Sequence, residues 1–118
     1  MAMDIFRLDS VIFHSAQLVK VRAFYQEVLQ LPVNRMEFEG AGRDDASESY
    51  VNFRCGETLL CLEAGATSDR GSVVLLTRSL AAARRHLELR GVALKRSSAE
   101  WLMFEDPEGR TIILQEKS

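Results

Sequence analysis

The stretch SVIFHSAQLVKVRAFYQEVL, residues 10–29, decides the fold because a second version of it begins 62 residues later. The second version is SVVLLTRSLAAARRHLEL, residues 72–89. Each begins with a short run rich in β-branched residues and continues, after a brief polar link, with apolar residues at helical spacing. In this alignment Leu18 corresponds to Leu80 and Tyr25 to Leu87. Internal repetition at a fixed offset predicts two copies of one structural unit.

Three strand-like runs follow each predicted helix. They are Val33 to Glu39, Tyr50 to Cys55 and Thr58 to Glu63 in the first half, and Val92 to Arg96, Trp101 to Glu105 and Thr111 to Glu116 in the second. Gly56-Glu57 and Asp106-Pro107-Glu108-Gly109 are typical of tight turns between strands. The polar stretch Gly40 to Ser49 has no apolar period, and we expect it to be a mobile loop.

The helix boundaries also follow from the residue types at each end. Pro32 closes the first predicted helix. Ser79 is the expected N-cap of the second helix and Gly91 the residue just after it. The element order βαβββ, repeated, predicts a single α+β domain over residues 1–118. Module one covers residues 4–63, the linker 64–70 and module two 71–117.

The composition narrows the class of protein. The chain has 118 residues, 47% of them apolar and 27% charged, with a net charge of -2, which is typical of a globular domain. No Lys/Arg run favours nucleic acid. We expect no signal peptide, because the N-terminus lacks a cationic start followed by an apolar segment. We also expect no membrane span, because the apolar runs are too short to cross a bilayer. The two cysteines lack zinc-site spacing, and we interpret them as reduced thiols of a cytoplasmic protein.

Strand alternation predicts which side chains point away from the helices, onto what we call the open face of each sheet. Phe13 and Leu75 are expected to face the helices. The residues expected on the open faces are Ser10, Ile12, His14, Tyr50, Asn52, Arg54, Leu59, Cys61 and Glu63 in module one, and Ser72, Val74 and Leu76 in module two. Cys55 and Cys61 then lie on opposite faces and cannot form a disulfide in this register.

This layout resembles the vicinal oxygen chelate superfamily, which includes glyoxalase I, extradiol dioxygenases and the fosfomycin- and bleomycin-resistance proteins. The resemblance is carried by the stretches LDSVIFHSAQLVKVRAFYQEVLQL (8–31), SVVLLTRSLAAARRHLELRGV (72–92) and FEDPEGRTIILQE (104–116). Phe24-Tyr25 and Asp106-Pro107-Glu108-Gly109 are its most specific parts. The resemblance implies two βαβββ modules that form a curled mixed sheet around a cavity, usually completed by a second subunit.

The metal-binding positions of the superfamily are where this sequence departs from it. The family carries a His on the first strand of each module and a Glu on the last strand, and these positions align to Ser10, Ser72 and Ile113. Serine is a poor ligand for transition metals and Ile is none. The only two histidines, His14 and His86, cannot supply a two-His, one-carboxylate site. We therefore expect no metal and no cofactor.

The expected cavity mixes apolar walls with a few polar points, which is typical of a small-molecule pocket. The predicted ligand-binding residues are Ser10, Ile12, His14, Tyr50, Asn52, Arg54, Leu59, Cys61, Ser72, Val74, Trp101, Met103 and Ile113.

Several of these residues also have a structural interpretation. His14 is either a ligand-contacting group or a hydrogen-bonded histidine near a strand end. Cys61 is either a reactive thiol or core filler. Trp101 either stacks on a flat ligand or is buried at a subunit contact. Arg54 and Glu63 either orient a polar ligand or pair with each other across the hairpin.

Three classes of function remain open. The first is a metal-free protein that binds or sequesters a small molecule, as the bleomycin-resistance branch does. The second is a lyase, isomerase or dioxygenase-like enzyme with an absent or non-standard metal site, for which His14, Glu63 and Tyr50 are the plausible acid/base set. The third is a structural or regulatory dimer with a filled cavity. We favour the first, assign no catalytic residue, and expect a homodimer under all three because the sheets leave open edges and apolar faces.

Overall fold

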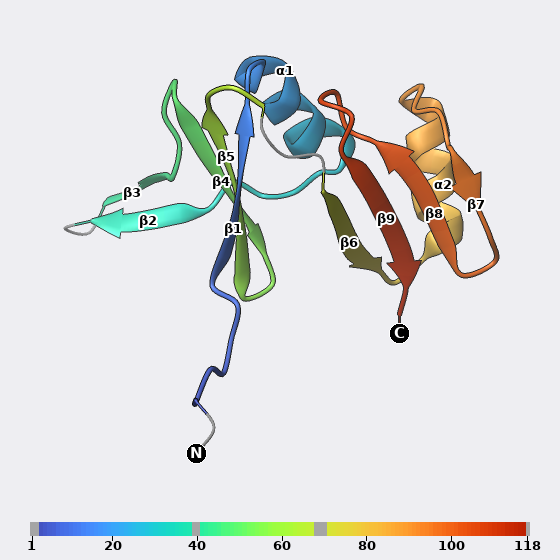
Figure 1. Ribbon diagram of the computed structural model, residues 1–118, viewed down its shortest axis with the longest axis horizontal. Coiled ribbons are helices and arrows are strands. Elements are labelled where there is room, and N and C mark those ends of the chain that lie inside the picture. Colours follow the sequence, from blue (N-terminus) through green and yellow to red (C-terminus); the bar gives the residue numbers. More distant parts are fainter. Residues whose placement is uncertain (1–2, 39–40, 68–70, 118) are drawn as a thin grey trace.

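Two βαβββ modules lie side by side in the computed structural model, which describes residues 3–38, 41–67 and 71–117 (Figure 1). Module one consists of β1 (Ser10–Ser15), α1 (Leu18–Ala23) with the π-helical turn η1 (Phe24–Val28), β2 (Arg35–Phe38), β3 (Ala41–Asp44), β4 (Tyr50–Cys55) and β5 (Thr58–Ala64). Module two consists of β6 (Ser72–Thr77), α2 (Leu80–Leu89), β7 (Arg96–Ser97), β8 (Trp101–Glu105) and β9 (Thr111–Glu116). Both the first strands and the helices begin 62 residues apart, so the predicted repeat and the α+β class are confirmed.

Each module has its own mixed sheet, and the sheets do not close into a barrel. The strand order is β1-β5-β4 in module one and β6-β9-β8-β7 in module two. The first strand of each module runs parallel to the last, while the other pairs are antiparallel. Among the described residues, β1 and β6 therefore each have a strand neighbour on one side only. No helix in this part of the chain is both long and apolar enough to cross a membrane.

Two of the predicted segments are wrong in detail. The segment predicted as a loop contains β3, which pairs with β2 as a two-stranded ribbon that lies apart from the main sheet (Figure 1). A ribbon that faces no core needs no apolar alternation, so residues 41–44 show no strand pattern in the sequence. Residues 39–40, at the end of the predicted second strand and the start of that loop, lie outside the described residues.

The predicted strand Val92 to Arg96 is also mostly absent. Only Arg96 and Ser97 pair with β8. Val92 and Leu94 pack against the core without joining a ladder. Apolar residues alternate in this segment as they do in a strand. The reason is that an extended segment can pack every second side chain against the core without pairing with another strand.

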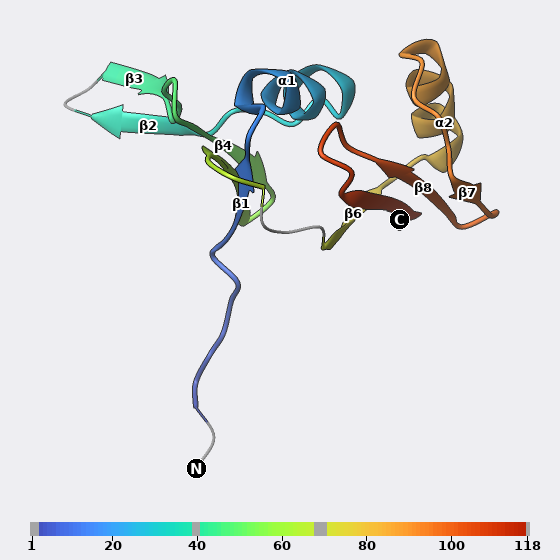
Figure 2. The same cartoon turned by 45° about the horizontal axis from the view of Figure 1, so that its top comes forward.

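Helix α1 and its continuation η1 pack against both modules. The Tyr25 ring stacks on Phe53 of β4, with 6.2 Å between centroids, and Phe24 lies 6.3 Å from Phe104 of β8. Figure 2 shows both helices on the same side of the sheets, with α1 next to the seam between the modules. One apolar cluster includes buried side chains from both modules. This shared packing fixes how the modules sit relative to each other.

A fully buried polar cluster of Tyr25, Asp106 and Arg110 joins the modules at this seam. The Asp106 carboxylate accepts hydrogen bonds from the Tyr25 hydroxyl at 2.7 Å and from Arg110 Nη1 at 3.2 Å. Its other oxygen accepts the backbone N–H groups of Glu108 and Arg110, each at 2.9 Å, and so shapes the turn. Arg110 also donates to the backbone carbonyl of His14 in β1. Burial and the adjacent Asp106 charge raise the pKa of Tyr25, so it stays a neutral donor.

Glu108, in the same turn, makes a second connection to module one. Its carboxylate accepts hydrogen bonds from Ser15 Oγ at 2.6 Å and Thr67 Oγ1 at 2.7 Å. It also accepts the backbone N–H of Gln17, the N-cap residue of α1, at 3.2 Å. The hydrogen bonds from Ser15 and then Thr67 lower the pKa of Glu108. The turn Asp106-Pro107-Glu108-Gly109 therefore also holds the two modules together.

Replacing Tyr25 by Phe is expected to lower the free energy of unfolding by about 1–3 kcal/mol, because a buried carboxylate loses a donor. Urea unfolding followed by circular dichroism, at one protein concentration, measures this. Tyr50→Phe is the matched control, since Tyr50 is half-buried on the open face, and it should change stability by less than about 0.5 kcal/mol. Equal effects of the two substitutions would contradict the role of the buried cluster.

Glu108→Gln is expected to make stability less dependent on pH in the acid range. Because the folded pKa of Glu108 is lowered, its contribution is present above the unfolded pKa of about 4.3 and is lost as the pH falls through the folded value. The stability difference between wild type and Glu108→Gln should therefore be largest near pH 7 and shrink below about pH 4. The exposed Glu57→Gln in the hairpin turn is the control. A difference that stays constant with pH would refute this assignment.

Candidate functional site

The open face of module one is assembled in the register that the alternation predicts. The pairs across the sheet are Ser10 with Leu59, Ile12 with Cys61 and His14 with Glu63 on one side of β5, and Tyr50 with Glu63, Asn52 with Cys61 and Arg54 with Leu59 on the other. Directly paired residues share a face. All eight of the predicted ligand-binding residues from this module therefore lie on one surface.

A hydrogen-bonded polar network runs along β4 on this face. Asp45 is buried, with 7% of its surface exposed, and its carboxylate accepts from Asn52 Nδ2 at 2.8 Å and Asn34 Nδ2 at 3.0 Å. Asn34 in turn accepts from Arg54 Nη2 at 2.8 Å and Nε at 3.2 Å. The network orients Asn52 and Arg54, and Asp45 supplies a buried negative charge behind them. Preorganised polar groups of this kind give a binding surface its specificity.

Sequence reasoning missed Asn34 and Asp45. Asn34 lies just before β2, and Asp45 belongs to the stretch expected to be a loop. Neither position has an apolar period or a motif that would have pointed to it. They are brought next to β4 by the segments that flank the β2–β3 ribbon, where Val33 bridges to Phe53 and Ala46 to Val51.

His14, Glu63 and Tyr50 lie together at the opposite end of this face. His14 Nε2 is 3.7 Å from Glu63 Oε1, with both side chains nearly half exposed. Tyr50 pairs with Glu63 across the hairpin. Arg54 lies opposite Leu59, and its guanidinium donates a hydrogen bond to Asn34. The alternative in which Arg54 and Glu63 pair with each other across the hairpin is therefore wrong. The face consequently carries a guanidinium at one end and a His–Glu pair at the other.

Cys61 lies in the middle of the face, and Cys55 faces the core side. Cys61 is 6% exposed, and burial, followed by the charges of Asp45, Glu63 and Asp9, raises its pKa. Burial also raises the pKa of Cys55. Both thiols are free. A raised pKa disfavours the nucleophilic thiolate, which supports the filler interpretation of Cys61.

The open face of module two is largely apolar and carries a shallow hollow of about 250 Å³. The hollow is lined by Val74, Trp101, Met103, Ile113 and Gln115. Four of these five were predicted as ligand-binding residues, and the structure brings them together. Ser72 lies outside the hollow, at the start of β6, and is exposed. Trp101 is half-buried at the start of β8 and available for stacking.

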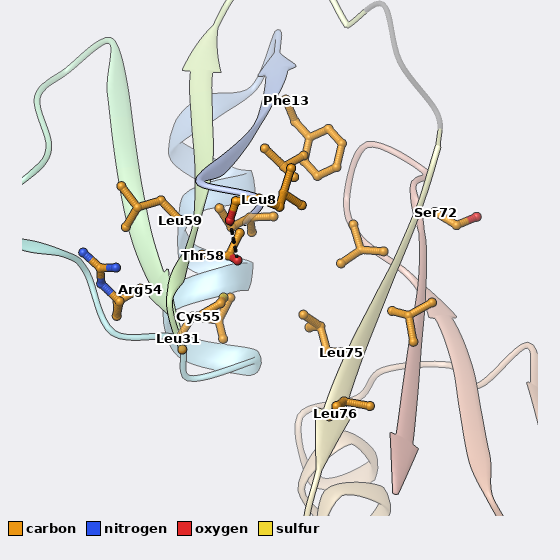
Figure 3. Close-up of a pocket in the computed structure, with 15 residues that line it drawn as sticks. Leu8, Phe13, Leu31, Arg54, Cys55, Thr58, Leu59, Ser72, Leu75 and Leu76 are labelled. Carbon is orange, nitrogen blue, oxygen red and sulfur yellow. Dashed lines mark hydrogen bonds between the residues drawn. The ribbon is translucent and has the colours of Figure 1, made fainter. Parts of the chain in front are cut away.

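The two open faces do not meet within one chain. Figure 3 shows Phe13 and Leu75 pointing into the space between the modules, whereas Leu59 points away from it on one side and Ser72 on the other. The seam itself contains an apolar groove of about 740 Å³. Its lining includes core-facing side chains such as Val11, Phe13 and Leu75, and also the predicted binding residues Arg54, Leu59, Ser72 and Val74. These four residues therefore border the groove, whereas the other predicted binding residues divide between the open face of module one and the hollow of module two, here called the two half-sites.

The residues at the expected metal positions do not fit a transition metal. Ser10 and Ser72 offer neutral hydroxyls and Ile113 no donor atom, whereas such ions prefer imidazole, thiolate or carboxylate ligands. In the described ranges, no three His, Cys, Asp or Glu side chains are grouped closely enough to hold a metal ion. His86 does not reach the open face, because its Nε2 makes a 2.6 Å hydrogen bond with the Val28 carbonyl at the end of η1.

Both native thiols are expected to react slowly with iodoacetamide at pH 7.5, at least about tenfold more slowly than free cysteine, because burial limits access and disfavours the thiolate. Mass spectrometry of the labelled protein measures the rate. In urea, both Cys55 and Cys61 should be labelled rapidly. Fast labelling of Cys61 in the folded protein would instead support the reactive-thiol interpretation.

Comparison with known proteins gives a structural relationship only. No protein-family model and no curated protein sequence matches the chain. Among solved structures, a glyoxalase/dioxygenase from Nostoc punctiforme superposes with a TM-score of 0.78 at 13% identity, covering 98% of this chain and 93% of that one. TnmS3, an antibiotic binding protein from Streptomyces sp. CB03234, has a TM-score of 0.73 at 20% identity, covering 99% and 100%.

A third similar structure is lactoylglutathione lyase from Agrobacterium tumefaciens. Its TM-score is 0.72 at 15% identity, over 93% of this chain and 92% of that one. These neighbours include both enzymes and a binding protein, and at such low identity they establish the architecture alone. The chain therefore shares its fold with glyoxalases and with an antibiotic binding protein, which is the fold that the resemblance to the vicinal oxygen chelate superfamily implied.

Proposed function

We propose that this protein binds a small, partly aromatic molecule without a metal ion, in a site formed between two copies of the chain. The observation that carries this proposal is the pairing of two half-sites with complementary chemistry, one polar and one apolar. Among the described residues, neither half-site groups three His, Cys, Asp or Glu side chains that could hold a metal ion. A sequestering or carrier role needs only the binding surface.

The polar half-site is the open face of module one. Arg54 and Asn52 are held in place by the Asn34–Asp45 network, and His14 and Glu63 lie at the other end. The apolar half-site is the hollow around Trp101 and Met103. A ligand enclosed by both would stack on the indole and present its polar substituents to module one, which is the usual division of roles in a small-molecule pocket.

The requirement for a second copy follows from the geometry of the single chain. The two half-sites lie on faces that point apart (Figure 3), and the hollow of module two is shallow. Ile12, Val74 and Leu76 are 49%, 55% and 62% exposed on these faces. Exposed apolar residues of this size, next to unpaired strand edges, favour association. A homodimer that joins module one of one chain to module two of another would form two equivalent sites.

The His14–Glu63 pair supports an enzyme as the second candidate. Their separation of 3.7 Å and the adjacent Tyr50 provide a group that could move a proton on a bound ligand. A lyase or isomerase of this kind would not require a metal. Turnover that is lost in His14→Gln while ligand binding persists would favour this alternative over simple binding.

The proposed function is tested by titrating the protein with anilinonaphthalene sulfonate, an aromatic anion that fluoresces in apolar sites. We expect saturable binding of one dye per chain. Trp101→Ala should weaken it about tenfold, because stacking is lost together with apolar contact area. Leu89→Ala is the control, since Leu89 is 87% exposed on α2, away from both half-sites.

Metal analysis of the same samples separates the two candidates further. Protein purified without a chelating tag should contain much less than one first-row transition metal per chain. One tightly bound metal per chain, or equal dye affinities of Trp101→Ala and wild type, would contradict the proposed function.

A further inference from the structure

A pocket of about 490 Å³ lies where the end of η1 in module one meets β6 and α2 of module two. Both helical segments lie on the same side of the sheets (Figure 2). The volume is in the range of small-molecule sites, and the lining is mostly apolar, with Leu29, Leu75, Leu87 and Leu114 among its side chains. No Phe, Tyr or Trp in the described part of the chain lines it. The pocket therefore offers no ring for stacking and suits an aliphatic chain.

Arg78 brings a positive charge to this apolar pocket. Its side chain lines the pocket, is exposed, and makes no hydrogen bond or ion pair with the described residues. No Asp or Glu from the described ranges is part of the lining. Glu116 comes near, but its carboxylate accepts the Leu80 N–H at 2.9 Å at the start of α2. An unpaired guanidinium next to an apolar lining is complementary to a carboxylate on an aliphatic chain, which Arg can bind through two parallel hydrogen bonds.

Gln30 lines the same pocket in a backbone conformation that is unfavourable for glutamine. Its φ is 58°, and it is the only non-glycine residue with a positive φ among the described residues. The position follows η1, where the Leu31 N–H donates to the Tyr25 carbonyl at 3.0 Å, and glycine is the usual residue there. Strained residues of this kind cluster at binding sites. Glycine would relieve the strain, but only a longer side chain places an amide donor next to the pocket.

A hydrogen bond between the modules fixes the walls of the pocket. His86 of α2 lines it, and its Nε2 donates to the Val28 carbonyl of η1 at 2.6 Å. Because a carbonyl can only accept, Nε2 carries the proton. In the same π-helical turn, Tyr25 is anchored to Asp106 of module two at 2.7 Å. The two walls are thus held in place before a ligand arrives, which lowers the entropic cost of binding.

We propose that this pocket is a second binding site, which takes a small aliphatic carboxylate. The alkyl chain lies against the leucines between η1 and α2, and the carboxylate binds the Arg78 guanidinium, with the Gln30 amide as a further donor. None of the predicted ligand-binding residues lines this pocket, so the site is independent of the proposed function and needs no second copy. Because its lining comes from both modules, a bound ligand stabilises their arrangement.

Isothermal titration calorimetry with octanoate tests the site. The wild-type protein should bind one octanoate per chain, and octan-1-ol, which lacks the charge, at least about tenfold more weakly. Arg78→Gln should weaken octanoate binding at least about tenfold and leave octanol binding unchanged, because only the charged contact is lost. Arg85→Gln is the matched control, since Arg85 is exposed on α2 but does not line the pocket. Equal affinities of Arg78→Gln and wild type for octanoate would overturn the inference.

Two further substitutions separate binding from folding. Gln30→Gly should weaken octanoate binding severalfold while the melting temperature stays the same or rises, because glycine adopts a positive φ without strain. Ala82→Leu should fill the pocket and weaken binding at least about tenfold. Ala81→Leu is its control, because Ala81 is also exposed on α2 but lies outside the lining. Octanoate binding that is equally tight in Ala82→Leu and Ala81→Leu would place the ligand elsewhere and overturn the inference.

The dye titration separates this inference from the proposed function. Octanoate should not displace anilinonaphthalene sulfonate, and Trp101→Ala should bind octanoate as tightly as wild type. Protein that binds the dye but no octanoate, or that releases the dye as octanoate binds, overturns the second site and leaves the proposed function standing. A chain that binds octanoate but no dye contradicts the proposed function alone.

Discussion

The buried ion pair between Asp106 and Arg110 determines how the two halves of this protein are arranged. Both side chains are fully buried, and the pair reaches module one through the Tyr25 hydroxyl and the His14 carbonyl. Removing one partner of such a pair typically costs about 3–5 kcal/mol, because the remaining charge is buried without compensation. The Arg110 guanidinium also lies 4.8 Å from the centre of the Phe13 ring. Module two can therefore not rotate toward the first sheet without breaking this cluster.

This fixed arrangement explains why the candidate site is divided. With α1 packed at the seam, the helix-facing sides of both sheets meet there, and the open faces point apart. The polar network of Asn52 and Arg54 thus belongs to one surface and the Trp101 hollow to another. In the part of the chain that the structure describes, β1 and β6 also each have one edge with no strand neighbour. A second copy is the simplest way to cover these edges and to oppose the two half-sites, and this links the proposed assembly to the proposed function.

The fold could be predicted from sequence because its signals are local. The Ser79 cap and the strand alternation depend on near neighbours, and the repeat shows the same local pattern a second time, 62 residues later. Each of these features is observed. The residues that join the modules or shape the polar half-site could not be predicted. Arg110 follows a turn glycine and looks like a surface residue, and Asp45 lies in a polar stretch. Arg110 bonds to the His14 carbonyl of the other module, and Asp45 bonds to Asn34 and Asn52 of neighbouring segments. A single sequence has no periodic signal for such contacts.

Subunit mixing tests the central claim, that each site is formed by two chains. Ile12→Arg would block the module-one face and Met103→Arg the module-two face, so each variant alone should bind no dye. If the two are unfolded and refolded together, half of the dimers should be mixed, and each mixed dimer should contain one intact site. The account predicts recovery of about a quarter of the wild-type dye binding, by this symmetry argument. A mixture that binds no more dye than the separate variants, while wild type binds normally, would contradict it.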